Sequence, residues 1–172
     1  MNTVFLSIGS NINKDYNILK CLELLEDSYG NMTKSSIYET FKVNNDTTIE
    51  IHNHGKNFWN LMIKINTFDT YSTILKKTRD IENDLGRKRN KNDKAADRTI
   101  DIDIILFNQE IIVHNGVTKV PHRELGHCFY VDIPLLELDA SIIHPLEKKS
   151  IKEIVDKTYL EKCQKFIKKV ER

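Results

Sequence analysis

The chain has 172 residues, with 26 Lys and Arg against 25 Asp and Glu, so its formal net charge is only +1. This length allows one domain with a proper core and leaves little room for a second, so we expect residues 1–172 to form a single domain. The balanced charge gives no electrostatic reason to expect a nucleic acid duplex or an anionic membrane as a partner.

The cysteines and the apolar segments predict the cellular location. Cys21, Cys128 and Cys163 are odd in number and lack metal-ligand spacing, which argues against a disulfide framework or a zinc site and favours a reducing compartment. No apolar stretch approaches the length needed to cross a bilayer. We therefore expect a cytoplasmic protein.

The first part of the chain alternates between strand and helix periodicity. Six segments follow one another as strand, helix, strand, strand, helix and strand: 3–8, 15–29, 31–40, 57–67, 70–85 and 98–107. Gly30 and Gly86 supply helix ends, and Thr70 can cap the second helix. This order predicts an α+β fold with a ferredoxin-like βαββαβ core, in which helices cover one face of an antiparallel sheet.

The remainder of the chain predicts additions to that core. Asn108-Gln109 is typical of a tight turn, which would fold residues 110–114 back as a hairpin. Residues 129–138 are apolar enough for a buried helix, and residues 150–170 have an amphipathic helical pattern with many Lys and Glu. We expect a C-terminal hairpin and helices that pack on the core.

The last core strand carries the most informative pattern. Asp101 and Asp103 are two positions apart and leave a strand on the same face, while Ile100, Ile102 and Ile104 point to the other face. Paired carboxylates suit Mg²⁺, which takes one or two protein oxygens and completes its shell with water and substrate phosphates. A cationic segment, 87–98, precedes the pair. Carboxylates beside cations predict a phosphoryl-transfer site.

A second interpretation of the same residues stays open at this point. Asp101 and Asp103 can pair with Lys94 and Arg98 as an ion-pair cluster at the surface, which would contribute little to stability and nothing to catalysis.

Several motifs in chain order resemble the 6-hydroxymethyl-7,8-dihydropterin pyrophosphokinase family. They extend from residue 4 to about residue 145, and the Arg-x-x-Asp-x-Asp strand is their most specific part: 8–11, 58–60, Glu82 with Gly86-Arg87, 98–107, 120–122, Phe129 and Pro134-Leu135. The resemblance implies transfer of diphosphate from ATP to the hydroxymethyl group of the pterin, with release of AMP, in folate biosynthesis.

The resemblance also implies roles for particular residues. Asp101 and Asp103 would hold two Mg²⁺ ions, and Arg87 and Arg98 would contact phosphate oxygens. The positions that match nucleotide contacts are Glu82, Arg87, Arg98, Ile104, His122 and His127. The positions that match pterin contacts are Asn60, Phe129, Phe58, Thr40 and Val43.

Three positions depart from the family pattern. Asp97 stands where the family often has Pro, Ala95 where many members have Trp, and His127 where Arg is expected. A neutral imidazole cannot replace a guanidinium. One alternative is therefore a catalytically weakened or non-catalytic pterin or nucleotide binder. Another is a single-stranded RNA module, which two Asp side chains on the open sheet face disfavour because they repel phosphates.

Overall fold

The computed structural model describes residues 1–40, 57–88 and 97–171. In chain order its elements are β1 (Asn2–Ser10), α1 (Lys14–Tyr29), β2 (Thr33–Lys34), β3 (Tyr38–Thr40), β4 (Phe58–Thr67), α2 (Tyr71–Asp84), β5 (Asp101–Phe107), β6 (Ile112–His114), β7 (Val117–Val120), α3 (Phe129–Leu138), α4 (Ile151–Ile154), α5 (Lys157–Cys163) and β8 (Ile167–Lys169).

The main sheet has the strand order β5-β1-β4-β3-β8, with β2 also paired to β4. Every pairing along this path is antiparallel. The first four strands of the path follow the ferredoxin-like arrangement, because β4 lies between the two strands that flank α1. The predicted fold is confirmed. The expected strand over residues 31–40 is present as two short strands, β2 and β3.

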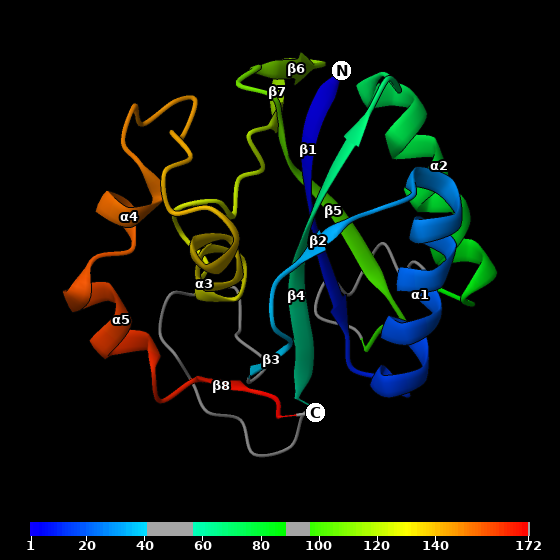
Figure 1. Ribbon diagram of the computed structural model, residues 1–172, viewed down its shortest axis with the longest axis horizontal. Coiled ribbons are helices and arrows are strands. Elements are labelled where there is room, and N and C mark those ends of the chain that lie inside the picture. The colour runs from blue at the N-terminus through cyan, green and yellow to red at the C-terminus, as the bar shows by residue number, and fades with distance from the viewer. Residues whose placement is uncertain (41–56, 89–96, 172) are drawn as a thin grey trace.

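One face of the sheet packs on α1 and α2 (Figure 1). Alternate residues of β1 point to this side, where they meet apolar residues from both helices. The fully buried members of this cluster include Val4, Leu6, Ile8, Ile18, Cys21, Leu25 and Ile74. The Thr70 side chain caps α2 by accepting a hydrogen bond from the Thr73 amide, as the sequence predicts.

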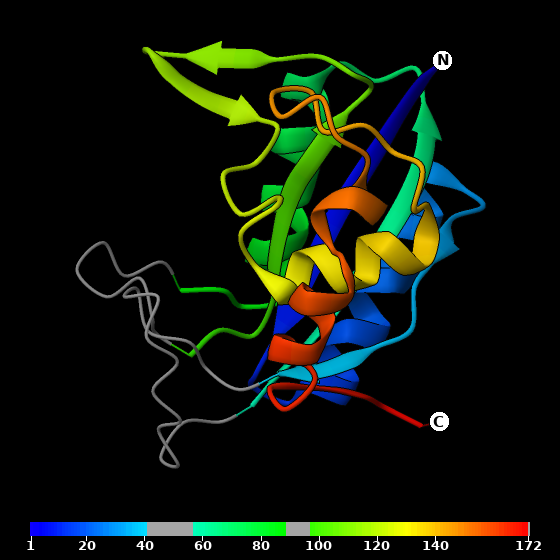
Figure 2. The ribbon, with the colours of Figure 1, turned by 90° about the vertical axis from the view of Figure 1, so that its left-hand side faces the viewer.

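The opposite face is covered in part by α3, with α4 and α5 outside it (Figure 2). Phe5 and Met62 point to this side and pack with Val131 and Leu135 of α3. The predicted buried helix over 129–138 is confirmed. Ser7, Gly9 and Asn60 continue this face of the sheet, since they alternate in register with Phe5 and Met62.

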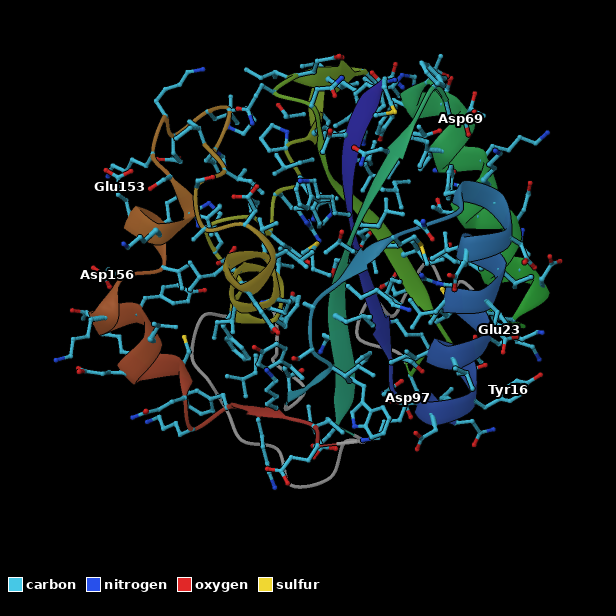
Figure 3. All side chains as sticks on the ribbon, in the orientation of Figure 1. Tyr16, Glu23, Asp69, Asp97, Glu153 and Asp156 are labelled. Carbon is cyan, nitrogen blue, oxygen red and sulfur yellow. The ribbon has the colours of Figure 1, made fainter. Side chains whose placement is uncertain are left out.

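The hairpin and the helices expected in the last third of the chain are present, but they differ from the prediction in two details. The hairpin joins β6 to β7 through Asn115-Gly116, both at positive φ, and does not pair residues 110–114 with β5. An Asn-Gly pair is the strongest local hairpin signal, and it outweighs the Asn108-Gln109 turn. The amphipathic stretch 150–170 forms two short helices, capped by Ser150 with Glu153 and by Asp156 (Figure 3), and then the edge strand β8.

Two further points concern burial. In the described ranges, none of the helices combines the length and the apolar character needed to cross a bilayer. His144 is only 4% exposed, and its Nδ1 accepts hydrogen bonds from the amides of Leu146 and Glu147. It therefore organises the turn that follows it in the chain.

Candidate active site

The two carboxylates of β5 lie on the face of the sheet that α3 partly covers. Asp101 is paired with Gly9 of β1, and Asp103 with Ser7. The alternate residues Ile100, Ile102 and Ile104 are at most 5% exposed and belong to the core under α1 and α2. The predicted division of this strand into an acidic face and an apolar face is confirmed.

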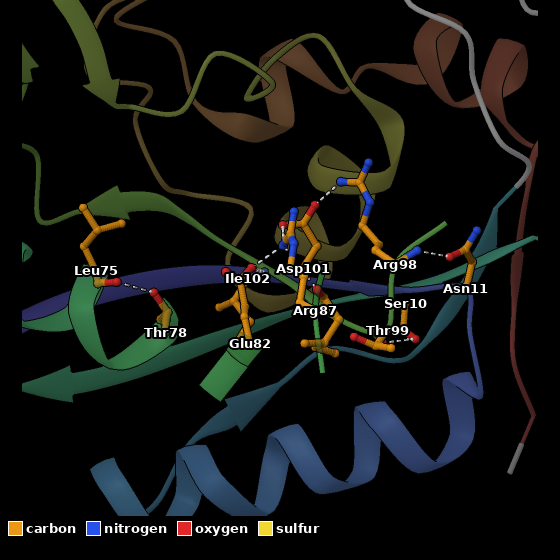
Figure 4. A network of polar contacts seen from close by, with 11 residues as sticks. Ser10, Asn11, Leu75, Thr78, Glu82, Arg87, Arg98, Thr99, Asp101 and Ile102 are labelled. Carbon is orange, nitrogen blue, oxygen red and sulfur yellow. Dashed lines mark hydrogen bonds and ion pairs between the residues drawn. The ribbon is translucent and has the colours of Figure 1, made fainter. Parts of the chain in front are cut away.

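Asp101 is the centre of a network of charges from three segments (Figure 4). Arg87, just after α2, donates to both Glu82 and Asp101, and Arg98 donates to the other oxygen of Asp101. Glu82 is 1% exposed and also accepts a hydrogen bond from the Ile102 amide at 2.9 Å. The network is largely buried, so the alternative of a loose surface ion-pair cluster does not describe it.

The two carboxyls have opposite electrostatic environments. Burial would raise the pKa of Asp101, but hydrogen bonds and charge from Arg87 and Arg98 outweigh it and lower that pKa. Burial and the neighbouring charges of Asp101, Glu124 and Glu82 raise the pKa of Asp103 to about 8. In the described residues both guanidinium groups pair with Asp101, and neither forms an ion pair with Asp103.

This donor set fits a hard divalent cation. Asp103 is a largely but not fully buried carboxyl with the charges of Asp101, Glu124 and Glu82 nearby, and such a group is costly to ionise unless a cation joins it. Asp101 has lone pairs beyond those used by the two arginines, and two adjacent carboxylates match the needs of Mg²⁺. The residues that could hold the metal are therefore Asp101 and Asp103.

A second group of residues lies beside Asp101, across β1. Asn60 is the partner of Gly9 on β4, and a Cβ atom on residue 9 would lie 2.9 Å from Asn60 Oδ1. Asn60 Nδ2 donates to Thr40 Oγ1 at 2.7 Å. The Phe58 ring faces this position too, with the Arg98 guanidinium carbon 5.7 Å from its centroid. The sheet thus places an amide oxygen and an aromatic ring next to the charged network.

The predicted pterin contacts differ in their surroundings. Asn60, Phe58 and Thr40 are brought together, whereas Val43 lies outside the described residues. Phe129 is 7% exposed and packs with Phe166 and Cys163, on the side of α3 that faces β8. Its neighbour Tyr130 contacts Glu124, and burial followed by the Glu124 charge raises the Tyr130 pKa. The Glu124 charge also helps to raise the pKa of Asp103, so Tyr130 and Asp103 share an acidic neighbour.

The predicted nucleotide contacts also separate into two groups. His122 lies close to the network, since Asp101 and Glu124 influence it; burial chiefly lowers its pKa. His122 is anchored by its amide, which donates to the Ile105 carbonyl of β5. His127 is exposed, and its electrostatic neighbours are Asp132 and His144. The Ile104 side chain lies in the core, so its backbone is what it can offer to a ligand.

Sequence reasoning missed the residues that hold this arrangement in place. Gly9 leaves the space between Asp101 and Asn60, and Ser10 and Asn11 bond to the backbone before β5. The signal was the Gly-Ser-Asn turn within residues 8–11, which belongs to the family motifs named above but was given no role for its individual residues.

The antiparallel fold and the site together define a class of protein. Two adjacent carboxylates, two arginines that pair with one of them, and an amide and an aromatic ring across β1 are groups suited to phosphoryl transfer. A family model described as 7,8-dihydro-6-hydroxymethylpterin-pyrophosphokinase (HPPK) matches residues 5–140. The chain belongs to this family of diphosphotransferases.

Individual relatives agree. The 2-amino-4-hydroxy-6-hydroxymethyldihydropteridine pyrophosphokinase of Aquifex aeolicus is 35% identical over 154 residues, covering 89% of this chain and 90% of the relative. The Bacillus subtilis protein of the same name is 32% identical over 140 residues, covering 80% and 78%.

Solved structures show the same fold. A wild-type HPPK-DHPS chain from Plasmodium falciparum, solved with pterin and p-hydroxybenzoate, superposes with a TM-score of 0.73 at 16% identity and covers 99% of this chain. This chain spans 45% of that one, so it corresponds to less than half of the solved polypeptide.

Proposed function

We propose that residues 1–172 act as one pterin pyrophosphokinase domain, which transfers the β,γ-diphosphoryl group of ATP to the hydroxymethyl oxygen of 6-hydroxymethyl-7,8-dihydropterin and releases AMP. The alcohol oxygen forms a new bond to the β-phosphorus, and the bond between the β-phosphorus and the α,β-bridging oxygen breaks. The bridging oxygen leaves on AMP, and the hydroxyl proton is released to solvent. The observation that carries the proposal is the paired Asp101 and Asp103 beside Arg87 and Arg98, in a chain of this family.

Asp101 and Asp103 would hold Mg²⁺, two ions by the family resemblance. When bound, the metal supplies charge that neutralises triphosphate oxygens and orients them for attack. The chain's own part is to keep both carboxylates on one face of a rigid strand. Since a buried Asp103 next to Asp101 is costly to ionise, binding of a dication and loss of the Asp103 proton are coupled.

Arg87 and Arg98 would contact phosphate oxygens. Both guanidinium groups pair with Asp101 from opposite ends of the segment 87–98. Glu82 also holds the Arg87 guanidinium, whereas Arg98 is held through its backbone amide, which donates to Asn11 Oδ1. Charge that is fixed before the substrate arrives needs no reorganisation in the transition state, which is the main source of catalysis in phosphoryl transfer. His122 and Glu82 are the further residues proposed to contact the nucleotide. His127 is exposed, away from the carboxylates, and the Ile104 side chain lies in the core, so Ile104 could contact the nucleotide only through its backbone.

The pterin would lie over Gly9, between Asn60 and the aromatic residues. The Asn60 amide has its Nδ2 directed to Thr40, so its Oδ1 faces the Gly9 position and can accept a hydrogen bond from a ring N–H or an amino group. Phe58 offers an aromatic face at this place, and α3 offers Tyr130 as well as the predicted Phe129.

One assay tests the function. The protein is incubated with ATP, Mg²⁺ and the hydroxymethyl-dihydropterin, and AMP is measured by chromatography. We expect AMP only when the pterin and the metal are both present. Asp101→Asn and Asp103→Asn should lose activity, whereas Asp80→Asn, which changes an exposed carboxylate on α2, should keep it. Binding of the pterin without AMP formation would instead support the non-catalytic binder and contradict the enzymatic proposal.

The proposed partners are small molecules, ATP and the pterin, without nucleic acid or membrane. A cytoplasmic location agrees with three free cysteines, two of them buried.

A further inference from the structure

The turn after β1 is bonded to the backbone that leads into β5. The Asn11 amide donates to the Arg98 carbonyl at 3.2 Å, and the Arg98 amide donates back to Asn11 Oδ1 at 2.7 Å. Next to this pair, the Ser10 hydroxyl donates to the Thr99 carbonyl at 2.6 Å (Figure 4). Asn11 is 3% exposed and Ser10 is fully buried. These bonds bring two distant parts of the chain into one fixed geometry.

The second amide atom of Asn11 has a partner of its own. Asn11 Nδ2 donates to Asp97 Oδ1 at 2.6 Å, and Figure 3 shows Asp97 beside the end of β1 and the start of α1. Asp97 is the position at which the family often has Pro. Proline restrains the backbone through its ring, and Asp does not. In this chain the hydrogen bond from Asn11 to Asp97 restrains the backbone at residue 97, where a proline ring would do so covalently.

The residue that this restraint holds is Arg98. Its guanidinium lies between Asp101, to which it donates, and the Phe58 ring. A long side chain of this kind loses considerable rotamer entropy when it is fixed, so its geometry depends on a backbone that starts it in the right direction.

We propose that Asn11 and Asp97 form a lock that positions Arg98 for the phosphates of the nucleotide. Both are positioning residues, because each acts through Arg98. The lock rests on the proposed function, since it gives Arg98 its purpose there. It also explains the departure at residue 97: the acidic side chain is turned to Asn11 and serves as a hydrogen-bond acceptor.

The test reverses the direction of the hydrogen bond. Asn11→Asp keeps an acceptor for the Arg98 amide but places a carboxylate against Asp97, so the lock is broken. Asp97→Asn keeps an acceptor for Asn11 Nδ2 and is the matched control. The double variant N11D/D97N restores the bond, with the new amide donating to the new carboxylate.

We expect N11D to raise KM for ATP about tenfold, a usual size for the loss of a hydrogen bond next to charged groups, with less than about a twofold change in KM for the pterin. D97N should stay within about twofold of wild type, and the double variant should recover most of the loss. A double variant no better than N11D, or equal effects on both substrates, overturns the lock.

A second readout separates this proposal from the proposed function. The exchange rate of the Arg98 amide proton, measured by NMR without substrates, should rise in N11D and return in the double variant. Repulsion between the carboxylates at positions 11 and 97 displaces the residue 11 side chain, to which that amide donates. This result would support the lock even if no AMP forms. Unchanged exchange in N11D would contradict it even if the protein is fully active.

Discussion

Gly9 and Asn60 lie directly opposite one another on β1 and β4, so closely that a Cβ atom on residue 9 would lie 2.9 Å from Asn60 Oδ1. The amide cannot simply turn away, because its Nδ2 is bonded to Thr40. The absence of a side chain at residue 9 therefore fixes the amide oxygen next to Asp101, and this contact underlies the first two predictions.

Gly9→Ala should reduce both stability and pterin binding. The added methyl group meets the Asn60 oxygen, and overpacking of this kind costs about 1–3 kcal/mol. We expect a higher KM for the pterin and a lower free energy of unfolding in urea. The variant Gly9→Ala/Asn60→Ala removes the clash but not the binding defect. Failure of that double variant to regain stability over Gly9→Ala would show that the clash is not the cause.

Thr40→Val should weaken pterin binding by releasing the Asn60 amide. Valine keeps the shape and strand preference of threonine but leaves a buried Nδ2 donor without its acceptor, at a cost of about 1–3 kcal/mol. We expect KM for the pterin to rise while KM for ATP changes little. Thr40→Ser retains the hydroxyl and is the control; equal defects in both variants would point to packing rather than to the hydrogen bond.

Asp101→Asn and Asp103→Asn should both abolish diphosphate transfer but affect stability differently. Asp101 pairs with Arg87 and Arg98, and breaking a buried ion pair from one side costs about 3–5 kcal/mol. Asp103 has a pKa raised to about 8, chiefly by burial, so at neutral pH its carboxyl is largely protonated and Asn is a close substitute. Urea unfolding in the presence of EDTA measures the difference. Equal destabilisation would contradict the assigned charge states.

The contribution of Asp132, a residue outside the site, to the stability of the protein should fall between about pH 4 and pH 6. Burial raises the Asp132 pKa from 3.8 to about 6, although the Gly126 amide and the Tyr159 hydroxyl donate to its oxygens. A folded-state pKa above the unfolded value means that the stability contributed by Asp132 is fully present below pH 3.8 and is lost as the pH rises through 6.

The size of that loss is up to about 3 kcal/mol, from about two pKa units at 1.36 kcal/mol each. Asp132→Asn can keep both contacts, since its carbonyl accepts from Gly126 and its amide donates to the tyrosine oxygen. The difference in unfolding free energy between wild type and this variant should therefore change across the interval. Parallel stability–pH curves for the two proteins would rule out Asp132 as the titrating group.

The sequence was sufficient for the core of the fold. Periodicity and end signals gave both core helices, the buried helix 129–138 and the strand that carries Asp101 and Asp103, because each depends on its own residues. It misplaced the hairpin, whose Asn115-Gly116 turn was overlooked, and it missed β8. That strand forms from an amphipathic segment because β3 offers it a free edge, which no local pattern records.

For the site, the sequence alone determined which groups are present: two carboxylates on one face of a strand, two arginines and an amide within an apolar run. Only the tertiary structure decided how they are related. In the folded chain both arginines pair with Asp101, and the pKa of Asp103 is raised. Asn60 Oδ1 lies beside Gly9, and Phe129 packs against Phe166. The physical reason is that the spacing of residues fixes the face of a strand, whereas charge pairing and burial depend on segments that meet only when the chain folds.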